Sequence, residues 1–398
     1  MNTVAGKCLD VLFRNAIVVD GTGAPSFRGD VGVKGDTIVF VRPAKAKKPD
    51  YDAVQEIDCS GLVLSPGFID IHNHSDVAIF LSPDASNYIS QGVTTVLVGN
   101  CGSSGAPIGG QEPDLLFSGG FQPDWRSFAE YMAALDRLPK AINIGSLVGH
   151  GQIRRRVVGL EARDPTDEEL LQMQEYVREA MEAGAFGLST GLIYSPGMYA
   201  KTPEIVALAQ VAGQYGGLYS THLRSESDLE ADAVLEAVQI ARASGCRVQV
   251  AHLKASGKRN WGMVKTSLDL MEYARRLGVE ITCDAYPCTP SGASLFVLYP
   301  GWARSGGKTA VQKLAKDPAA RAKIRRELQK PALDWENIYF DAGPDGLLIT
   351  LSNVHPEYQG KTLAEVAKIR GEDPIETIFT LAGEDIDIQM IAGGMSEE

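Results

Sequence analysis

The sequence predicts an α/β protein: a (β/α)8 TIM-type barrel with a small N-terminal β-domain. Helix and strand patterns alternate over residues 166–283. The glycines that end successive predicted helices recur 29 to 33 residues apart, at positions 184, 216, 245 and 278. This spacing is typical of βα units around a parallel sheet. A doubly wound open sheet is the alternative architecture, but no GxGxxG motif follows the first strand.

Residues 1–62 are expected to form part of the small β-domain, with a sandwich-like arrangement. Residues 10–23 alternate polar and apolar side chains and end in a turn at Asp20-Gly21. Residues 30–41 repeat this pattern as a hairpin. The lysine-rich segment 44–52 is expected to be an exposed loop.

Residues 63–398 are expected to form the barrel. Seven strands are predicted, beginning near residues 63, 93, 142, 185, 217, 246 and 279. Thr166 and Glu169 form a capping box at the start of one helix, and Pro203 takes the first position of the next. Residues 302–360 interrupt the alternation and are predicted to be an insertion.

An eighth strand is not recognisable before Glu398, so we expect it to be missing from this chain. A barrel left open at this point has strand edges without partners, which is an aggregation liability. We therefore expect the isolated chain to be marginally stable or to form homo-oligomers.

Composition and charge exclude several classes of function. Of the 398 residues, 44% are hydrophobic and 22% are charged, which is ordinary for a folded globular protein. The 50 acidic residues outnumber the 38 basic ones, and a net charge of -12 disfavours nucleic-acid binding. No apolar run approaches the roughly 18–20 residues of a membrane span, and no secretory signal is recognisable. The six cysteines form no disulfide framework, so we expect a reduced, cytoplasmic protein.

Five of the six histidines follow the carboxyl ends of predicted strands. They are His72, His74, His150, His222 and His252, and Cys101 follows a strand in the same way. In a βα barrel these strand ends gather on one face, where the active site forms. At i, i+2 on a strand, His72 and His74 would share one face about 7 Å apart. Imidazole and thiolate together favour zinc over magnesium or calcium, and the Cys101 thiolate could bind one ion or bridge two.

Other polar residues suggest a substrate pocket beside these ligands. Lys254 follows His252 and could hold a substrate carboxylate, with help from the Tyr286 hydroxyl. His150 is left open as a residue that supports a ligand, faces the substrate or packs in the core. The arginines at 154–156 are predicted to lie on a solvated face or an interface. Arg224, Glu226 and Asp284 also lie near strand ends. For these three, a salt bridge within a loop is as much expected as a role in the pocket.

Seven segments of the chain stand in a distinctive order. They are DVLFRNAIVVDGTGAPSFRGDVGV, SPGFIDIHNHSD, GVTTVLVGNCG, GAFGLSTGLIYSPG, STHLRSE, VAHLKASG and CDAYP. Together they resemble the N-acyl-D-amino-acid deacylases (D-aminoacylases) of the amidohydrolase superfamily, from about residue 10 to the end of the chain. Hydantoinase-like members of that superfamily bridge two metals with a carboxylated lysine at the end of strand four. The fourth strand here, AFGLSTG, offers no lysine.

The resemblance implies a zinc-dependent hydrolase that cleaves the amide bond of N-acyl-D-amino acids to a carboxylate and a D-amino acid. It implies a tight zinc site formed by Cys101, His222 and His252. It also implies a second, weaker site formed by His72 and His74 with Cys101. The D preference comes from the resemblance alone.

The resemblance further implies which residues bind the substrate. Lys254 and Tyr286 resemble residues that bind the substrate carboxylate, and Tyr194 resembles an active-site tyrosine. One departure is Pro287-Cys288, where the family often has a second tyrosine after the proline.

The family also carries a catalytic aspartate at the end of strand eight, in a segment like GSDG. Neither Asp385 nor Asp387 stands in such a segment. We therefore expect the aspartate to lie beyond the chain end and assign no catalytic residue. On the same ground we expect residues 1–398 to hydrolyse N-acetyl-D-methionine negligibly.

Two alternative functions stay open at this point. One is a cyclic-amide hydrolase (hydantoinase- or dihydroorotase-like) or a dipeptidase on the same scaffold. The other is a non-catalytic fragment or pseudoenzyme that keeps the fold. The expected partner is a small-molecule N-acyl amino acid, with neither nucleic acid nor membrane.

Overall fold

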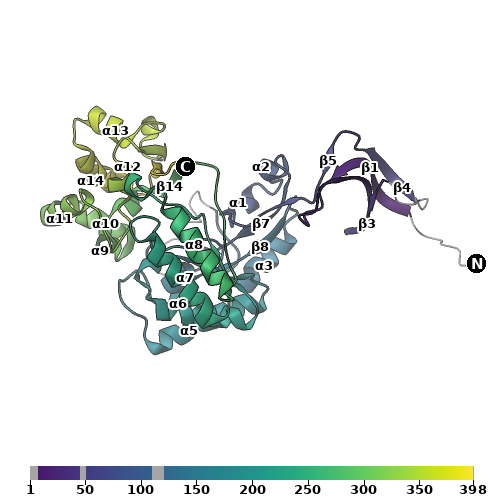
Figure 1. Ribbon diagram of the computed structural model, residues 1–398. Helices are drawn as coiled ribbons and strands as arrows, with labels where there is room; N and C mark the ends of the chain where they lie inside the picture. The colour runs from purple at the N-terminus through teal and green to yellow at the C-terminus, as the bar shows by residue number, and fades with distance from the viewer. Residues whose placement is uncertain (1–7, 45–50, 110–120, 398) are drawn as a thin grey trace, which may run out of the picture. The chain divides into compact units, whose positions relative to one another are not determined.

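The computed structural model describes residues 8–44, 51–109 and 121–397 (Figure 1). The chain divides into two compact units. The first comprises the residues up to Phe68 together with 91–94, and the second comprises 69–90 and the chain from Thr95 onward. The sequence placed this boundary between residues 62 and 63.

The first unit is a five-stranded sheet. Its strands are β1 (Cys8–Val18), β2 (Phe27–Lys34), β3 (Thr37–Pro43), β4 (Asp52–Asp58) and β5 (Val63–Leu64). The order is β3-β2-β1-β4, and β5 also pairs with β1. Ala16, Val18 and Val31 form a small core with Cys59. The small N-terminal β-domain is confirmed, although its described strands form one sheet rather than a sandwich.

The strand predicted to begin near residue 63 is divided in two. Val63 and Leu64 pair with β1, and a separate strand, β6, covers Phe68–Asp70. Pro66 stands between them and has no N–H group with which to continue a ladder. Gly67 passes so close to Thr94 that a Cβ there would lie 2.1 Å from the threonine hydroxyl oxygen. The chain therefore changes sheets at this point.

The second unit contains a series of strands that lie in chain order. After β6 come β7 (Val93–Val98), β8 (Asn143–Ser146), β9 (Val148–Gly149), β10 (Gly187–Gly191), β11 (Leu218–His222), β12 (Arg247–Val250) and β13 (Ile281–Cys283). The pairs β7–β8 and β9–β10 and each later pair are parallel. Strands β8 and β9 are separated only by Leu147, whose N–H group donates to the Val98 carbonyl at 2.9 Å.

This order decides between the two predicted architectures. A doubly wound sheet reverses its strand order at a switch point, whereas β7 to β13 follow one another without reversal. The alternative is therefore wrong, and the singly wound βα series is confirmed. Among the described residues, no strand pairs with the free edge of β13, so closure into an eight-stranded barrel stays a prediction.

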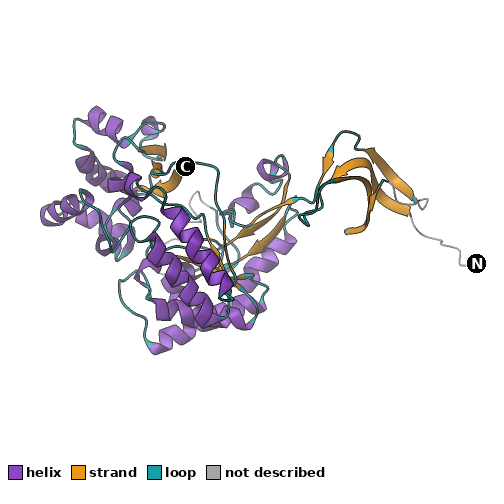
Figure 2. Cartoon of the chain, viewed as in Figure 1, coloured by secondary structure: helices purple, strands orange, loops and turns teal. Residues whose placement is uncertain are grey.

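Helices connect the parallel strands and lie alongside them (Figures 1 and 2). They are α1 (Ala78–Leu81), α2 (Ser86–Ile89), α3 (Phe128–Arg137), α4 (His150–Val157), α5 (Asp167–Glu182), α6 (Thr202–Gln214), α7 (Glu230–Ser244) and α8 (Met263–Arg276). Thr166 and Glu169 form the predicted capping box of α5, which buries Met173, Val177 and Met181. Consecutive helices from α5 to α8 pack against one another.

Residues 290–393 form a separate layer within the second unit. Its strands β14 (Pro290–Ser294), β15 (Leu347–Leu351) and β16 (Gln389–Gly393) form an antiparallel sheet in the order β14-β16-β15. Its helices are α9 (Gly301–Arg304), α10 (Gly307–Leu314), α11 (Pro318–Leu328), α12 (Ile338–Ala342), α13 (Leu363–Arg370) and α14 (Pro374–Glu384). One hydrophobic core, including Leu295, Leu347 and Ile378, joins these elements. The predicted insertion at 302–360 is thus the middle of a larger structural layer.

No helix in the described part of the chain is both long and apolar enough to cross a membrane.

Burial of an acidic residue at the start of α7 makes the stability depend on pH. Glu230 is fully buried, and this burial, partly offset by the neighbouring Ser267 hydroxyl, raises its pKa to about 7. In the unfolded chain the carboxyl ionises near its ordinary value of 4.5. A raised folded pKa means that the stabilisation is complete below the unfolded value and is lost as the pH rises through the folded value.

We therefore expect the free energy of unfolding to fall by about 3 kcal/mol between about pH 4.5 and pH 7, relative to Glu230→Gln. Urea unfolding of both proteins at pH 5 and pH 8 measures this difference. Glu168→Gln, in the first turn of α5 and exposed, serves as the control and should follow the wild type. An equal pH dependence of wild type and Glu230→Gln would contradict the assignment.

Candidate metal centre and substrate pocket

Five side chains converge where the parallel strands end. His72 and His74 follow β6, Cys101 follows β7, His222 ends β11, and His252 follows β12. Their ligand atoms form two groups, His72/His74/Cys101 and Cys101/His222/His252. Within each group all atoms lie within 4.8 Å of one another. The structure thus brings together the five residues that the sequence selected, with Cys101 common to both groups.

The distances place the Cys101 sulfur between two imidazoles. Its Sγ lies 3.4 Å from His72 Nε2 and 3.5 Å from His252 Nε2. The His222 and His252 rings are 4.4 Å apart between centroids, and the His72 and His74 rings are 5.3 Å apart. The Cys101 sulfur therefore lies close to imidazoles of both ligand groups.

The local backbone differs from the predicted strand at His72 and His74. Strand β6 ends at Asp70, whose carboxylate accepts hydrogen bonds from the His72 backbone N–H at 3.1 Å and the Asn73 side chain at 2.8 Å. This carboxylate folds the chain into a turn after the strand. The two imidazoles converge because of that turn and not because they alternate on a strand.

Two of the ligands have a strained backbone. Cys101 has φ of 53° and His252 has φ of 38°, a left-handed region that costs a non-glycine residue of order 1–3 kcal/mol. After Cys101, the Gly102 N–H donates to Ser189 Oγ at 3.1 Å. The His252 N–H donates to Asp284 Oδ1 at 2.7 Å. Neighbouring strands therefore hold both residues in conformations that they would not adopt alone.

The electrostatic environment keeps three of the four imidazoles neutral. Burial lowers the pKa of His72 to about 3 and also lowers the pKa of His74 and of His222. Burial raises the pKa of the Cys101 thiol. A neutral imidazole has a lone pair available for a metal ion, and a bound ion deprotonates a coordinating thiol.

Several buried nitrogen atoms of the cluster lack hydrogen bonds within the described chain. These are Nδ1 of His72 and both ring nitrogens of His222. Buried polar atoms without partners are costly, so a metal ion bound to one of the His222 nitrogens would stabilise this arrangement. Thiolate and imidazole are donors that zinc prefers. The residues present therefore fit a zinc ion.

A cavity of about 350 Å³ opens over the cluster. Besides the five ligand residues, its lining includes Tyr194, Lys254, Tyr286, Glu226 and Glu336. The Tyr194 ring packs edge-on against His222 at 4.9 Å. Burial raises the pKa of both tyrosines, so their hydroxyls stay protonated and can donate hydrogen bonds.

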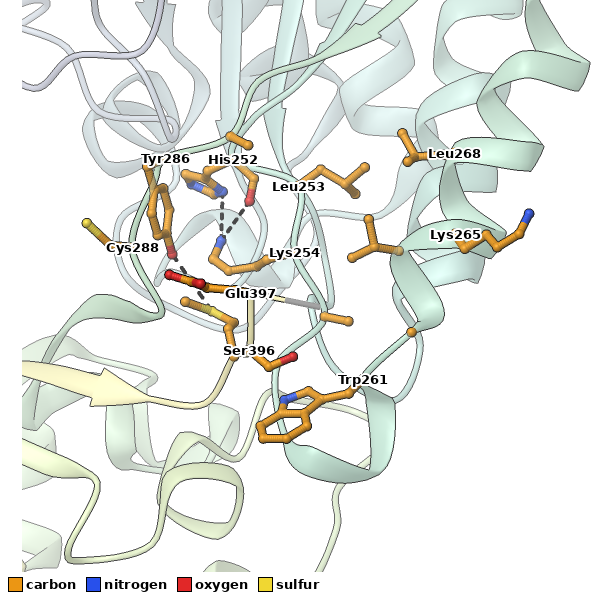
Figure 3. Close-up of a pocket in the computed structure, with 15 residues that line it drawn as sticks. His252, Leu253, Lys254, Trp261, Lys265, Leu268, Tyr286, Cys288, Ser396 and Glu397 are labelled. Carbon is orange, nitrogen blue, oxygen red and sulfur yellow. Dashed lines mark hydrogen bonds between the residues drawn. The ribbon is translucent and has the colours of Figure 1, made fainter.

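A second cavity of about 390 Å³ adjoins the first and shares His252, Lys254 and Tyr286 with it (Figure 3). The Lys254 ammonium turns back toward His252, lying 2.9 Å from its Nδ1 and donating to its carbonyl at 3.0 Å. It also donates to Glu226 Oε1 at 2.6 Å and lies 5.4 Å from the centre of the Tyr286 ring. Lys254 is therefore in the pocket, but its charge is paired with Glu226.

The two buried glutamates extend the predicted site. Glu226 was noted only as a polar residue after His222, and Glu336 was not predicted. Glu336 Oε1 accepts a hydrogen bond from the Glu226 backbone N–H at 3.1 Å. Burial, with the nearby charge of Glu226, raises the pKa of Glu336 to about 8. Glu336 lies 110 residues from Glu226 in sequence, and no local motif marks it.

Other candidates from the sequence lie outside the ligand cluster. His150 is fully buried and its Nε2 lies 2.8 Å from Glu204 Oε1, so it packs in the core. The prediction for the arginine run is wrong at Arg154, which is fully buried and pairs with the same glutamate. Arg224 pairs with Glu236 through two hydrogen bonds. Asp385 and Asp387 bind Ser352 and Lys308, respectively.

Comparison with known proteins places the chain in a family. The amidohydrolase family matches residues 55–288, more than half of the chain. The chain belongs to the amidohydrolase family. This amidohydrolase is 33% identical over 369 residues to the N-acyl-D-glutamate deacylase of Alcaligenes xylosoxydans xylosoxydans, covering 92% of this chain and 66% of the relative. It is 38% identical over 282 residues to a D-aminoacylase of the same organism, covering 70% of this chain and 57% of the relative.

A solved structure with the same fold is an N-acyl-D-glutamate deacylase from Bordetella bronchiseptica. The TM-score is 0.80 at 33% identity, and the match covers 98% of this amidohydrolase and 72% of the neighbour. That neighbour was solved with zinc and a phosphonate inhibitor that mimics the tetrahedral intermediate. The present chain spans 57–66% of the length of the two curated relatives.

Cys101 belongs to both ligand groups, so its replacement tests metal binding. We expect the purified amidohydrolase to hold one or more zinc ions per chain, and Cys101→Ala to hold at least tenfold less. Elemental mass spectrometry on chelator-free, size-selected protein measures both. Cys246→Ala is the matched control, because Cys246 is a buried free cysteine whose thiol donates to the Ala209 carbonyl at 3.1 Å and lies outside the two ligand groups. Equal zinc content in wild type and Cys101→Ala would remove Cys101 from the centre.

Proposed function

We propose that this amidohydrolase carries the zinc centre and the substrate pocket of an enzyme that hydrolyses N-acyl-D-amino acids to a carboxylate and a D-amino acid. The observation that carries the proposal is the pair of ligand groups sharing Cys101, at the base of a cavity that also contains a lysine and two tyrosines. The names of the relatives support the substrate class and its D configuration. Strand β10, Gly-Leu-Ser-Thr-Gly, offers no lysine of the kind that the cyclic-amide alternative requires.

Two sites for metal are proposed within the cluster. Cys101, His222 and His252 form the tight site, and His72 and His74 form a second, weaker site with Cys101. When bound, zinc polarises the acyl carbonyl and lowers the pKa of water toward about 7. The protein contributes neutral imidazoles and a fixed sulfur, so little reorganisation is needed on binding.

The substrate carboxylate is proposed to bind Lys254 and Tyr286. The Lys254 ammonium has three N–H donors, and the one directed to the His252 carbonyl can be redirected to a substrate carboxylate while Glu226 keeps another. The protonated Tyr286 hydroxyl supplies a neutral donor beside it. Tyr194 packs against His222 and is proposed to form the wall of the pocket that faces the acyl group.

Binding of a phosphonate analogue of N-acetyl-D-methionine tests this proposal, because it engages the metal centre and the carboxylate pocket together without proton transfer. We expect zinc-loaded protein to bind the D analogue at least tenfold tighter than the L analogue in isothermal titration calorimetry. We expect zinc-free protein to lose this binding. A zinc-loaded protein that binds neither enantiomer would rule out the proposed function.

Lys254→Met tests the carboxylate contact. Loss of a charge-assisted hydrogen bond, about 1.5–3 kcal/mol, is expected to weaken phosphonate binding about 10- to 100-fold at matched zinc content. Lys265→Met is the control, because Lys265 lines the adjoining cavity but is exposed and pairs with Asp269. Equal losses in both variants would show a general charge effect and not a contact with Lys254.

A further inference from the structure

One buried carboxylate contacts three groups of the candidate centre at once. Glu226 is 4% exposed, and its Oε1 lies 2.8 Å from His252 Nδ1 and 2.6 Å from Lys254 Nζ. Its Oε2 lies 3.4 Å from His222 Nε2. The residue stands on the loop that follows β11, four positions after His222. It therefore touches two ligands of the proposed tight site and the proposed carboxylate-binding lysine.

The contacts of His252 indicate which of its nitrogens carries the hydrogen when the ring coordinates a metal through Nε2. His252 Nε2 faces the Cys101 sulfur at 3.5 Å, so this is the nitrogen directed at the shared ligand. An imidazole that coordinates through Nε2 carries its hydrogen on Nδ1. Two groups approach Nδ1, the Lys254 ammonium and the Glu226 carboxylate. An ammonium has no acceptor, so Glu226 is the group that can accept the Nδ1 hydrogen.

We propose that Glu226 is a positioning residue that holds His252 in the Nδ1–H tautomer and thereby strengthens metal binding at Cys101, His222 and His252. A carboxylate behind a coordinating histidine orients the ring and raises its basicity. The Lys254 ammonium donates to the same oxygen, Oε1, at 2.6 Å and so holds the carboxylate beside His252 Nδ1. The same contact connects the proposed substrate-binding lysine to the metal ligand through one carboxylate.

A different role for Glu226 is direct coordination. Its oxygens also lie within 4.8 Å of ligand atoms of His222 and Glu336. However, Oε1 already accepts two close contacts, from His252 and from Lys254. Positioning is therefore the assignment that the contacts favour, and direct coordination is an outcome that the experiment below separates from it.

The chain contains a matched control for this arrangement. Glu204 is also a buried glutamate that pairs with a histidine and a cation: its Oε1 lies 2.8 Å from His150 Nε2, and its Oε2 pairs with Arg154. His150 and Arg154 do not line the cavity over the metal cluster. Replacing Glu204 therefore disturbs an equivalent buried network without touching the proposed ligands.

The experiment compares zinc affinity in wild type, Glu226→Gln and Glu204→Gln by competition with a chromophoric chelator. We expect Glu226→Gln to bind zinc about 10- to 100-fold more weakly and Glu204→Gln to match the wild type. With cobalt in place of zinc, the thiolate charge-transfer band should persist in Glu226→Gln, and the ligand-field bands should shift. Glu226→Asp should recover part of the affinity.

A measurement on the wild type keeps the inference testable if Glu226→Gln fails to fold. Long-range ¹H–¹⁵N spectra of histidine-labelled, zinc-loaded protein contain only six histidines and report the tautomer of each. We expect His252 to carry its hydrogen on Nδ1 and to coordinate through Nε2. Coordination through Nδ1 would overturn the inference. So would unchanged zinc affinity and cobalt spectra in folded Glu226→Gln.

This inference rests on the proposed metal centre, and the two can fail separately. A wild-type protein that binds no metal removes the proposed function and the inference together. A wild-type protein that binds zinc as tightly as Glu226→Gln leaves the proposed function intact and removes only the role of Glu226. A change in the coordination number of cobalt between wild type and Glu226→Gln, seen in the ligand-field bands, would indicate direct coordination by Glu226 and overturn positioning.

Discussion

The convergence of four histidines on the Cys101 thiol is the constraint on which the rest of the site depends. Several imidazoles and a thiol are costly to gather in a protein interior unless their polar atoms find partners. Both ring nitrogens of His222 lack a hydrogen bond within the described structure. The arrangement fits a soft or borderline metal, because such an ion would bind one nitrogen of each imidazole together with the Cys101 sulfur.

The scaffold stabilises this cluster through contacts made by neighbouring strands. Cys101 and His252 have left-handed backbone conformations that a short peptide would not hold. Ser189 on β10 and Asp284 after β13 each fix the backbone at or beside one of these ligands. The parallel, sequential strand order matters here because it brings the carboxyl ends of β7, β10, β12 and β13 to one edge.

The layer formed by residues 290–393 is part of the site as well as part of the fold. Its hydrophobic core holds α12 and the loop before it, and this loop places Glu336 against Glu226. Two buried carboxyl groups whose oxygens lie within 4.8 Å of each other do not both ionise easily, which agrees with the raised pKa of Glu336. Glu336 has a raised pKa, and Glu226 is paired with Lys254. Together they give the pocket a pattern of charges that no single strand end would supply.

The sequence by itself determined the repeating βα units, the capping box of α5 and the residue types at the strand ends, because these depend on short-range periodicity and capping. The selection of Cys101 and its four histidines also needed only strand ends and donor chemistry. Tertiary structure alone decided that Asp70 turns the chain at His72, that Arg154 is buried, and that Glu226 and Glu336 meet across 110 residues. These features depend on desolvation and on long-range packing, and neither quantity can be read from a local pattern of residues.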